Sequence, residues 1–346
     1  IPSPTGQEEK KANFIYDRLS EEQVSIDEVG NVLYLHNNIG ESNRIIVVAA
    51  HIDTVFPDNI EIKPEIRDNK LYAPSVLDNS VNVAALLFII EMFNKLNINF
   101  KKGILFAFNV GEEGLGNLKG IRHIVDKWKS NIDGVIAVDG GYEKIVNKAV
   151  GSMRYRLEIN TEGGHSWSNF GNENAILHAA RLIDRLYKIN VPKEPKTTYN
   201  VGLINGGISV NTIAQNAEMM LDFRSEEGSC LEQLIKEYER ILLAVHDNSY
   251  DKVSRESKLI GERPCGINYH NPYPEIIEAV REDMGMVTEF ASGSTDANIP
   301  MSMGIPAISF GVGKGFGSHT TEEYLEIDSL ETGLEHLIRF ILEVAK

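Results

Sequence analysis

The chain has 346 residues, with 34 Lys and Arg against 50 Asp and Glu, which gives a formal net charge of -16 and a sequence pI near 5.1. This acid excess argues against DNA, RNA or an anionic membrane surface as a partner, because binding to phosphates requires clustered Lys and Arg. The longest apolar stretches, such as Val81 to Met92, fall short of the roughly 20 residues that cross a bilayer. The length allows about two domains whose cores need no disulfide or metal for stability. Any metal is therefore expected to serve chemistry.

The two cysteines, Cys230 and Cys265, lie far apart and outside any CxxC pattern. Neither a disulfide framework nor a thiolate zinc site is indicated, so we expect two free thiols in a cytoplasmic protein. The chain starts at Ile1 without a methionine, which leaves room for further native residues or a signal peptide before it.

Short apolar runs alternate with helical patterns in the first third of the chain. The pattern predicts three strands and two helices. The strands are Arg44 to Ala50, Gly103 to Val110 and Gly134 to Val138, and the helices are Val81 to Leu96 and Leu118 to Trp128. Strands that are apolar on both faces and alternate with helices predict an α/β fold, with a mostly parallel, mixed sheet sandwiched by helices.

From Gly151 the pattern changes to that of a smaller α+β domain. Tyr155 to Asn160 and Ala217 to Arg224 alternate as half-exposed strands do. Ala175 to Ile189 and Leu231 to His246 are amphipathic, as helices on one face of a sheet are. The sheet of this domain is therefore expected to have one open face.

The α/β pattern returns near Glu262 to Gly266. It predicts a helix at Pro274 to Met284, a buried strand at Ile305 to Gly311 and a closing helix at Leu330 to Val344. We therefore expect one α/β domain, residues 1–150 and 263–346, interrupted by an inserted α+β domain at residues 151–262.

The first buried strand runs into His51-Ile52-Asp53. In an extended segment His51 and Asp53 point the same way, because side chains repeat every two residues. A histidine that binds a metal commonly has its ring fixed by a carboxylate or carbonyl. Taken alone, this motif is more often an ordinary polar turn, and Asp78, before the long apolar helix, is more often a helix N-cap.

The predicted strand Gly103 to Val110 runs into Gly111-Glu112-Glu113-Gly114, two adjacent carboxylates framed by glycines. Neighbouring side chains diverge, so one carboxylate can bind a metal while the other acts as general base for a metal-bound water. A solvated acidic turn is the alternative interpretation. Asp139 follows the next strand, and His319 follows the late strand.

All of these side chains stand at the ends of apolar strands, where open α/β sheets bind their ligands. Two histidines and several carboxylates in one crevice would repel one another without cations, so the pattern favours a dinuclear metal centre. Nitrogen and oxygen ligands without a thiolate suit zinc, and also manganese or cobalt.

At this point the sequence resembles a known family, the dinuclear zinc hydrolases that include peptidase T, carboxypeptidase G and succinyl-diaminopimelate desuccinylase. The resemblance covers almost the whole chain, and its motifs occur in family order. They are Ile1-Pro2-Ser3-Pro4-Thr5-Gly6, the His51 motif, Asp78, the Glu112-Glu113 pair, Asp139, Gly163-Gly164-His165-Ser166, Ser294-Thr295-Asp296 and His319.

The resemblance implies a set of five ligands for two divalent metal ions. Asp78 is expected to bridge both metals. His51 and Asp139 would be the terminal ligands of one metal, and Glu113 and His319 those of the other. Zinc is the expected metal, with cobalt or manganese as alternatives.

The resemblance also implies the catalytic groups. Glu112 is expected to be the general base for a water that bridges the two metals, and Asp53 to be the partner that fixes the ring of His51. Family members have a cis peptide bond after the bridging aspartate, so we expect one at Asp78-Asn79.

The inserted domain resembles the lid and dimerisation domain of the family. His165 resembles the histidine that contacts the substrate carbonyl, often across a dimer interface, so a homodimer through this domain is expected. Asn211 and Arg224 match positions that hold the carbonyl and carboxylate of the substrate. The alternative for Arg224 is a surface arginine paired with any nearby acid.

Two departures from the family bear on the subfamily. After Asp78 most relatives continue with Lys or Gly-rich residues, whereas this chain has Asn79-Ser80-Val81-Asn82, and the usual proline near Ser166 is absent. An aspartate at the position of Asp139 is more typical of aminopeptidases and dipeptidases in this family, and a glutamate of carboxypeptidases and deacylases.

We therefore expect an enzyme that hydrolyses amide bonds in short peptides, an aminopeptidase of the di- or tripeptidase type. The alternative is an N-acyl amino acid amidohydrolase of the deacetylase or desuccinylase type, which would share every metal residue. A non-catalytic metal-binding relative is a third interpretation, but it would be expected to have lost Glu112 or a ligand, and none is lost. Caps and solubility alone do not explain why the acidic motifs occur in family order.

Overall fold

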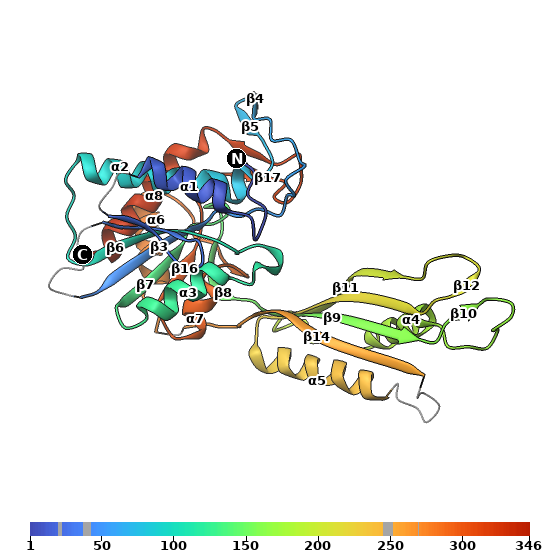
Figure 1. The fold of residues 1–346 in the computed structure, drawn as a ribbon. Coiled ribbons are helices and arrows are strands. Elements are labelled where there is room, and N and C mark those ends of the chain that lie inside the picture. Colours follow the sequence, from blue (N-terminus) through green and yellow to red (C-terminus); the bar gives the residue numbers. More distant parts are fainter. Residues whose placement is uncertain (20–22, 37–42, 245–251, 269) are drawn as a thin grey trace. The chain divides into compact units, whose positions relative to one another are not determined.

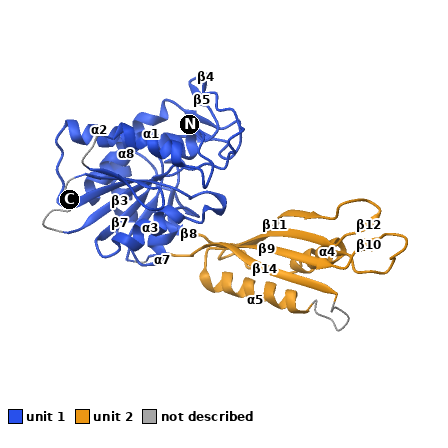
Figure 2. Ribbon diagram, in the orientation of Figure 1, with its two compact units in different colours: residues 1–149, 267–346 blue, residues 150–266 orange. Residues whose placement is uncertain are grey.

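The computed structural model describes residues 1–19, 23–36, 43–244, 252–268 and 270–346. The chain divides into two compact units, which Figure 2 colours separately. Unit 1 comprises Ile1–Ala149 and Ile267–Lys346, and unit 2 comprises Val150–Gly266. The first boundary therefore follows residue 149 where the sequence suggested 150, and the second follows residue 266 where it suggested 262.

Unit 1 is built on an eight-stranded sheet with the spatial order β1-β2-β6-β3-β7-β16-β8-β15 (Figure 1). At its centre β3 is parallel to both β6 and β7, whereas β2 is antiparallel to β6 and β16 is antiparallel to β8. The strands are β1 (Val24–Ile26), β2 (Val32–His36), β3 (Ile45–His51), β6 (Gly103–Asn109), β7 (Ile132–Ala137), β8 (Ile145–Ala149), β15 (Phe290–Gly293) and β16 (Ala307–Ser309). This mixed, mostly parallel sheet confirms the predicted fold class.

Helices cover both faces of this sheet. One face carries α1 (Glu9–Arg18), α2 (Val81–Lys95), α6 (Tyr273–Asp283) and α8 (Ser329–Val344), and the other carries α3 (Lys119–Trp128) and α7 (Asn298–Ser302). The alternation along β3 explains the two layers: Ile46 and Val48 pack in the core with α2, whereas Ile45 and Val47 pack in the core with α3. Every residue of β3 and β6 is buried, as expected for strands apolar on both faces.

The segment Val76–Lys95, which combines α2 with the turn before it, is a candidate membrane span by length and composition. Its mean hydropathy is 1.6 over the most apolar window, and 61% of that window is buried inside the protein. Leu86, Ile89 and Phe93 of α2 lie in the hydrophobic core of unit 1. In the described part of the chain it is the one helix of this kind, and its burial is that of a core helix.

A second, smaller sheet in unit 1 brings together two segments that are far apart in sequence. Its spatial order is β17-β18-β5-β4. Its strands are β4 (Glu65–Arg67), β5 (Lys70–Tyr72), β17 (Gly315–Phe316) and β18 (Tyr324–Glu326). Because β18 pairs with β5, the turn between β17 and β18 lies beside the segment that leads from β5 into α2.

Unit 2 is an antiparallel sheet with the order β11-β13-β9-β14, packed on one face against two helices (Figure 1). A separate two-stranded pair, β10 and β12, is formed by segments that lie between β9 and β13 in sequence. The elements are β9 (Gly151–Thr161), β10 (Gly164–His165), α4 (Ala175–Leu186), β11 (Thr197–Gly206), β12 (Thr212–Ile213), β13 (Asn216–Ser225), α5 (Gly228–Ala244) and β14 (Val253–Arg263). Residues of β13 alternate between buried and less buried, as in a sheet with one covered face.

The second boundary between the units lies later in the chain than the sequence suggested because of strand β14. This strand runs to Arg263, which pairs with Ser152 at the start of β9, so the four residues after position 262 belong to unit 2. The helix expected at Leu231 to His246 is described as far as Ala244, and its last two positions lie outside the described residues. The strand expected at Ile305 to Gly311 is only Ala307–Ser309, because the apolar run continues into buried loop residues.

Candidate metal centre

The central strands of unit 1 end in the residues that the sequence marked for chemistry. His51 is the last residue of β3, and Asp53 follows two positions later. Glu112 and Glu113 come shortly after β6, and Asp139 comes shortly after β7. Since β3 is parallel to both neighbours, these segments emerge at the same edge of the sheet.

Asp78 reaches this edge from the irregular segment Val76–Ser80, whose backbone is not helical at Asp78 and Asn79. Its carboxylate contacts both candidate histidines: Oδ1 lies 3.1 Å from Nε2 of His51, and Oδ2 lies 3.2 Å from Nε2 of His319. The Asp78-Asn79 peptide bond is cis, which confirms that prediction. Each oxygen of one carboxylate therefore faces a different imidazole, as a bridging ligand requires.

Each histidine also faces a second carboxylate. Nε2 of His51 lies 3.6 Å from Oδ1 of Asp139, and Nε2 of His319 lies 2.9 Å from Oε1 of Glu113. Ligand atoms of His51, Asp78 and Glu113 all lie within 4.8 Å of one another. The structure thus brings all five expected ligands together within unit 1, in two groups that share Asp78.

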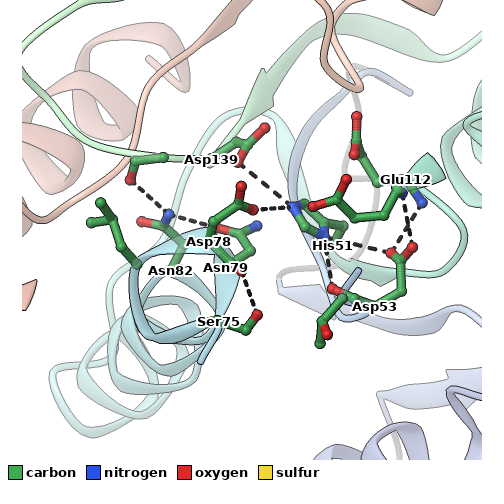
Figure 3. A network of polar contacts seen from close by, with 12 residues as sticks. His51, Asp53, Ser75, Asp78, Asn79, Asn82, Glu112 and Asp139 are labelled. Carbon is green, nitrogen blue, oxygen red and sulfur yellow. Dashed lines mark hydrogen bonds and ion pairs between the residues drawn. The ribbon is translucent and has the colours of Figure 1, made fainter. Parts of the chain in front are cut away.

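Asp53 lies on the other side of the His51 ring from Asp78 and Asp139 (Figure 3). Its backbone carbonyl is 3.2 Å and its Oδ1 is 3.5 Å from Nδ1 of His51. The same carboxylate accepts hydrogen bonds from the backbone N–H groups of Glu112, at 3.0 Å, and Glu113, at 2.8 Å. Asp53 therefore positions the glutamate pair as well as the histidine, a second role that the sequence pattern did not indicate.

The electrostatic environment of this cluster favours a positively charged ring at both His51 and His319. Burial alone would lower the pKa of His51, but hydrogen bonds with Asp139, Asp53 and Asp78 outweigh it and raise the pKa well above its usual value. Hydrogen bonds with Asp78 and Glu113 raise the pKa of His319 to about 10. The pKa of Asp78 is lowered, because its hydrogen bonds with the two histidines outweigh its burial.

The residues present fit two divalent metal ions. The cluster offers imidazole nitrogens and carboxylate oxygens without a thiolate, which is a donor set suited to zinc, manganese or cobalt. Both free cysteines belong to unit 2. The acidic residues outnumber the histidines, so cations at the ring nitrogens would relieve repulsion among the carboxylates.

Two further buried groups lie close to the cluster. Asp296 accepts a hydrogen bond of 2.7 Å from Asn109, the last residue of β6, and burial raises its pKa to about 7. Asp296 belongs to the motif Ser294-Thr295-Asp296, for which the sequence predicted no specific function.

Lys11 was not singled out in the sequence. It is buried, its ammonium lies 3.4 Å from Oγ of Ser80, and burial lowers its pKa to about 8, although Asp53 and Asp78 act in the opposite direction. The register of α1 was the available signal, because Lys11 falls beside Ala12 and Ile15 on the buried face.

Two of the expected substrate residues, His165 and Asn211, lie close together in unit 2. The β10–β12 pairing and a 3.0 Å hydrogen bond from the Ser166 N–H to the Asn211 carbonyl hold their segments side by side. Nδ1 of His165 accepts from the backbone N–H groups of Trp167 and Ser168, at 3.2 and 3.4 Å. In the neutral ring the proton is then on Nε2, so this histidine presents an N–H donor.

Arg224 lies elsewhere in unit 2. It pairs across the sheet with Ser152 and Thr198, near the end of β13, and its guanidinium lies 2.6 Å from Oδ2 of Asp222. Strand β13 begins at Asn216, and this end of the strand leads back to Asn211. Arg224 is near the other end, about 27 Å from Asn216 along the extended strand. Within one chain, unit 2 does not bring Arg224 together with His165 and Asn211.

An α/β sheet with imidazoles, carboxylates and an adjacent glutamate pair at the carboxyl edge of its strands defines the class of metal-dependent hydrolases. Residues 47–343 match the sequence profile of peptidase family M20/M25/M40, and the chain belongs to this family. It is accordingly a hydrolase, from a family that contains both peptidases and amidohydrolases.

Similar proteins cover almost the whole chain. The succinyl-diaminopimelate desuccinylase of Corynebacterium glutamicum is 25% identical over 95% of this chain and 90% of its own length. The acetylornithine deacetylase of Myxococcus xanthus is 24% identical over 90% of this chain and 84% of its own length. Among solved structures, a tripeptidase of Staphylococcus aureus superposes with a TM-score of 0.80 at 23% identity, covering 100% of this chain and 95% of its own. The aminopeptidase PepT of Bacillus cereus gives 0.75 at 22% identity, with 100% and 95% coverage. At this identity the structures establish the fold.

Proposed function

We propose that this chain is an aminopeptidase of short peptides, that it uses two divalent metal ions with zinc as the native metal, and that it works as a cytoplasmic homodimer. The observation that carries the proposal is the contact of one carboxylate, Asp78, with both His51 and His319. Each histidine has its own second carboxylate, so the site has two similar halves about one shared ligand. The two cysteines are free, which suits a reducing compartment.

The metals, when bound, would polarise the substrate carbonyl and make a water molecule acidic enough to lose a proton near neutral pH. Glu112 takes this proton as general base and later returns it to the leaving amine. Glu112 suits the role because its backbone N–H donates a hydrogen bond to the Asp53 carboxylate. This hydrogen bond fixes the backbone of Glu112 at the edge of the sheet. His165 would donate its Nε2–H to the substrate carbonyl, where negative charge develops.

The choice of peptides over acylated amino acids rests on Asp139 and on two of the solved structures with a similar fold, a tripeptidase and an aminopeptidase. A second candidate is favoured by relatives that include a desuccinylase and two acetylornithine deacetylases. That candidate is an N-acyl amino acid amidohydrolase, and it uses the same metal residues.

A substrate panel separates the two candidates. The protein, stripped with a chelator and reloaded with zinc, cobalt or manganese, is assayed with a free tripeptide, the same tripeptide acetylated at its N-terminus, and N-acetyl and N-succinyl amino acids. We expect cleavage of the free tripeptide, little cleavage of its acetylated form, and loss of activity after chelation. Exclusive cleavage of the acylated amino acids would contradict the aminopeptidase proposal.

We further propose that unit 2 is the lid and dimerisation domain, with a second copy of this chain as its partner. Large apolar side chains near His165 and Asn211 are strongly exposed, including Trp167 at 87% and Ile208 at 90%. Strand β11 is an edge of the sheet, and its exposed edge groups can pair with another strand. Apolar side chains next to polar ones at a sheet edge fit a self-complementary interface.

A mixing experiment tests both the dimer and the location of His165. Glu112→Ala and His165→Ala are each inactive in the catalytic step, but a mixed dimer in which His165 acts across the interface has one intact site. We expect mixing under exchange conditions to restore roughly a quarter of wild-type activity, as random pairing predicts. A monomer in solution, measured by light scattering, would contradict the dimer, and a dimer without restoration would place His165 in its own subunit.

A further inference from the structure

The segment that carries the bridging aspartate is not held by regular secondary structure. Val76–Ser80 has non-helical backbone angles at Asp78 (φ -117°, ψ 88°) and Asn79 (φ -134°, ψ 20°). Its position relative to the other ligands must therefore depend on side chains that bind it from outside. Two groups of buried side chains do so.

The first group is the carboxylate of Glu323, which we name the carboxylate clamp. Glu323 is fully buried, and its Oε1 accepts hydrogen bonds from the N–H groups of Leu77, at 2.7 Å, and Asp78, at 2.8 Å. Its Oε2 accepts from the N–H of Ser75 at 3.0 Å. Glu323 belongs to the same turn as His319, between β17 and β18, so this clamp joins the Asp78 segment to the His319 segment.

The second group is a pair of buried asparagines, Asn79 and Asn82, which we name the amide clamp. Nδ2 of Asn79 donates to the carbonyl of Val138 at 3.0 Å. Nδ2 of Asn82 donates to Oδ1 of Asn79 at 2.6 Å and to the carbonyl of Gly140 at 3.0 Å, as Figure 3 shows. Val138 and Gly140 are the two neighbours of Asp139, so this clamp joins the Asp78 segment to the Asp139 segment.

Helix capping does not account for Asn82. It stands in the first turn of α2, but its Oδ1 accepts from the N–H of Val312, outside the helix, at 2.9 Å. Its donors go to Asn79 and Gly140.

The two clamps correspond to the two halves of the site. The His51 position, formed by His51, Asp139 and Oδ1 of Asp78, depends on the spacing that the amide clamp holds. The His319 position, formed by His319, Glu113 and Oδ2 of Asp78, depends on the spacing that the carboxylate clamp holds. We infer that Asn79 and Asn82 tune metal affinity at the His51 position, and that Glu323 tunes it at the His319 position. These are positioning residues, and the inference rests on the proposed ligand assignment.

Metal titrations of single-position proteins test this separation. The metal-free chain is titrated with zinc or cobalt by calorimetry in two backgrounds. His319→Ala retains the His51 position, and Asp139→Ala retains the His319 position. Into each background we introduce Asn82→Ala, Asn79→Ala as an independent cut in the same clamp, or Glu323→Gln, which keeps the shape of the glutamate.

We expect a crossed result. In the His319→Ala background the asparagine variants should weaken binding about 10- to 100-fold, the usual effect of removing a group that orients a ligand, and Glu323→Gln should change it less than about threefold. In the Asp139→Ala background the effects should be exchanged. Ser80→Ala, in the same segment but in neither clamp, is the matched control.

The outcomes distinguish the inference from the function beneath it. Equal weakening by all variants in both backgrounds, or no weakening by any, overturns the clamps while leaving the metal site in place. If the wild-type chain fails to bind two ions, the ligand assignment fails and the inference fails with it. Thermal denaturation of each metal-free variant identifies any that do not fold, and the two asparagine variants give independent readings of one clamp.

Discussion

The two units hold their functional residues in contrasting ways. In unit 1 His51 and Asp53 are almost fully buried, and each is fixed by several polar contacts from separate segments. In unit 2 His165 and Asn211 are exposed, and their turns are held by contacts within each turn and between the two turns. The candidate metal ligands therefore come together within one unit of one chain, whereas the proposed substrate residues of unit 2 are exposed side chains.

The largest expected effect comes from the group in unit 1 that would perform chemistry without binding metal. Glu112→Gln removes the base but keeps the shape and the backbone contact with Asp53. We expect turnover to fall about 10²- to 10⁴-fold, the usual value of general acid–base catalysis, with metal content unchanged at two per chain. Steady-state kinetics with metal analysis measures this. A variant that keeps more than about a tenth of wild-type activity would show that Glu112 is not the base.

A somewhat smaller effect is expected from unit 2. His165→Ala removes an N–H donor to the developing oxyanion, so kcat should fall about 10²- to 10³-fold, as for other donors of this kind. Metal affinity should be unchanged, because His165 belongs to a different unit from the ligands. Ser168→Ala is the control, since only the backbone N–H of Ser168 contacts the ring. A change in metal affinity would show that His165 in unit 2 affects metal binding by the residues of unit 1.

In both units the sequence predicted central strands and long helices, and it missed outer strands such as β1, β2 and β15 of unit 1. Strands β3 and β6 are long runs of buried apolar residues, which can be recognised from their composition. Strands β11 and β14 were missed, because most of their residues are exposed and few are apolar. Helix α1 was missed because its charged residues conceal a narrow buried face.

The residues of the candidate site also differ in whether the sequence could predict them. The candidate ligands could be singled out from the sequence because each follows a strand or stands in a motif. The groups that hold them could not, because their partners are distant in sequence: Glu323 binds the N–H of Leu77 across 246 residues. No local pattern distinguishes such a glutamate from a surface acid before the small sheet brings the two segments together.

Arg224 tests whether both ends of unit 2 serve the substrate. If Arg224 binds the carboxylate of a peptide, Arg224→Ala should raise KM about tenfold for a free-acid tripeptide, corresponding to about 1.4 kcal/mol, and leave kcat unchanged. The same peptide with an amidated C-terminus should show no difference between variant and wild type. The competing interpretation is a surface ion pair with Asp222, worth about 0–1 kcal/mol, and an unchanged KM would establish it.

The smallest expected effect concerns His319, the ligand in unit 1 that most resembles the residues of unit 2, since 52% of its side chain is exposed. Asp78 and Glu113 raise the pKa of His319 to about 10 in the folded, metal-free chain. The ring therefore stabilises the fold fully below its unfolded pKa of about 6.5, and this contribution is lost as the pH rises through the folded pKa. In the metal-free state His319→Ala should lower Tm by a few degrees at about pH 6 and by almost nothing above about pH 10, with solvent exposure keeping the effect small. Denaturation scans of the wild type and the variant in chelator measure this difference in Tm across the pH range. A difference that stayed constant or widened with pH would mean that the carboxylates of unit 1 do not hold a proton on this ring.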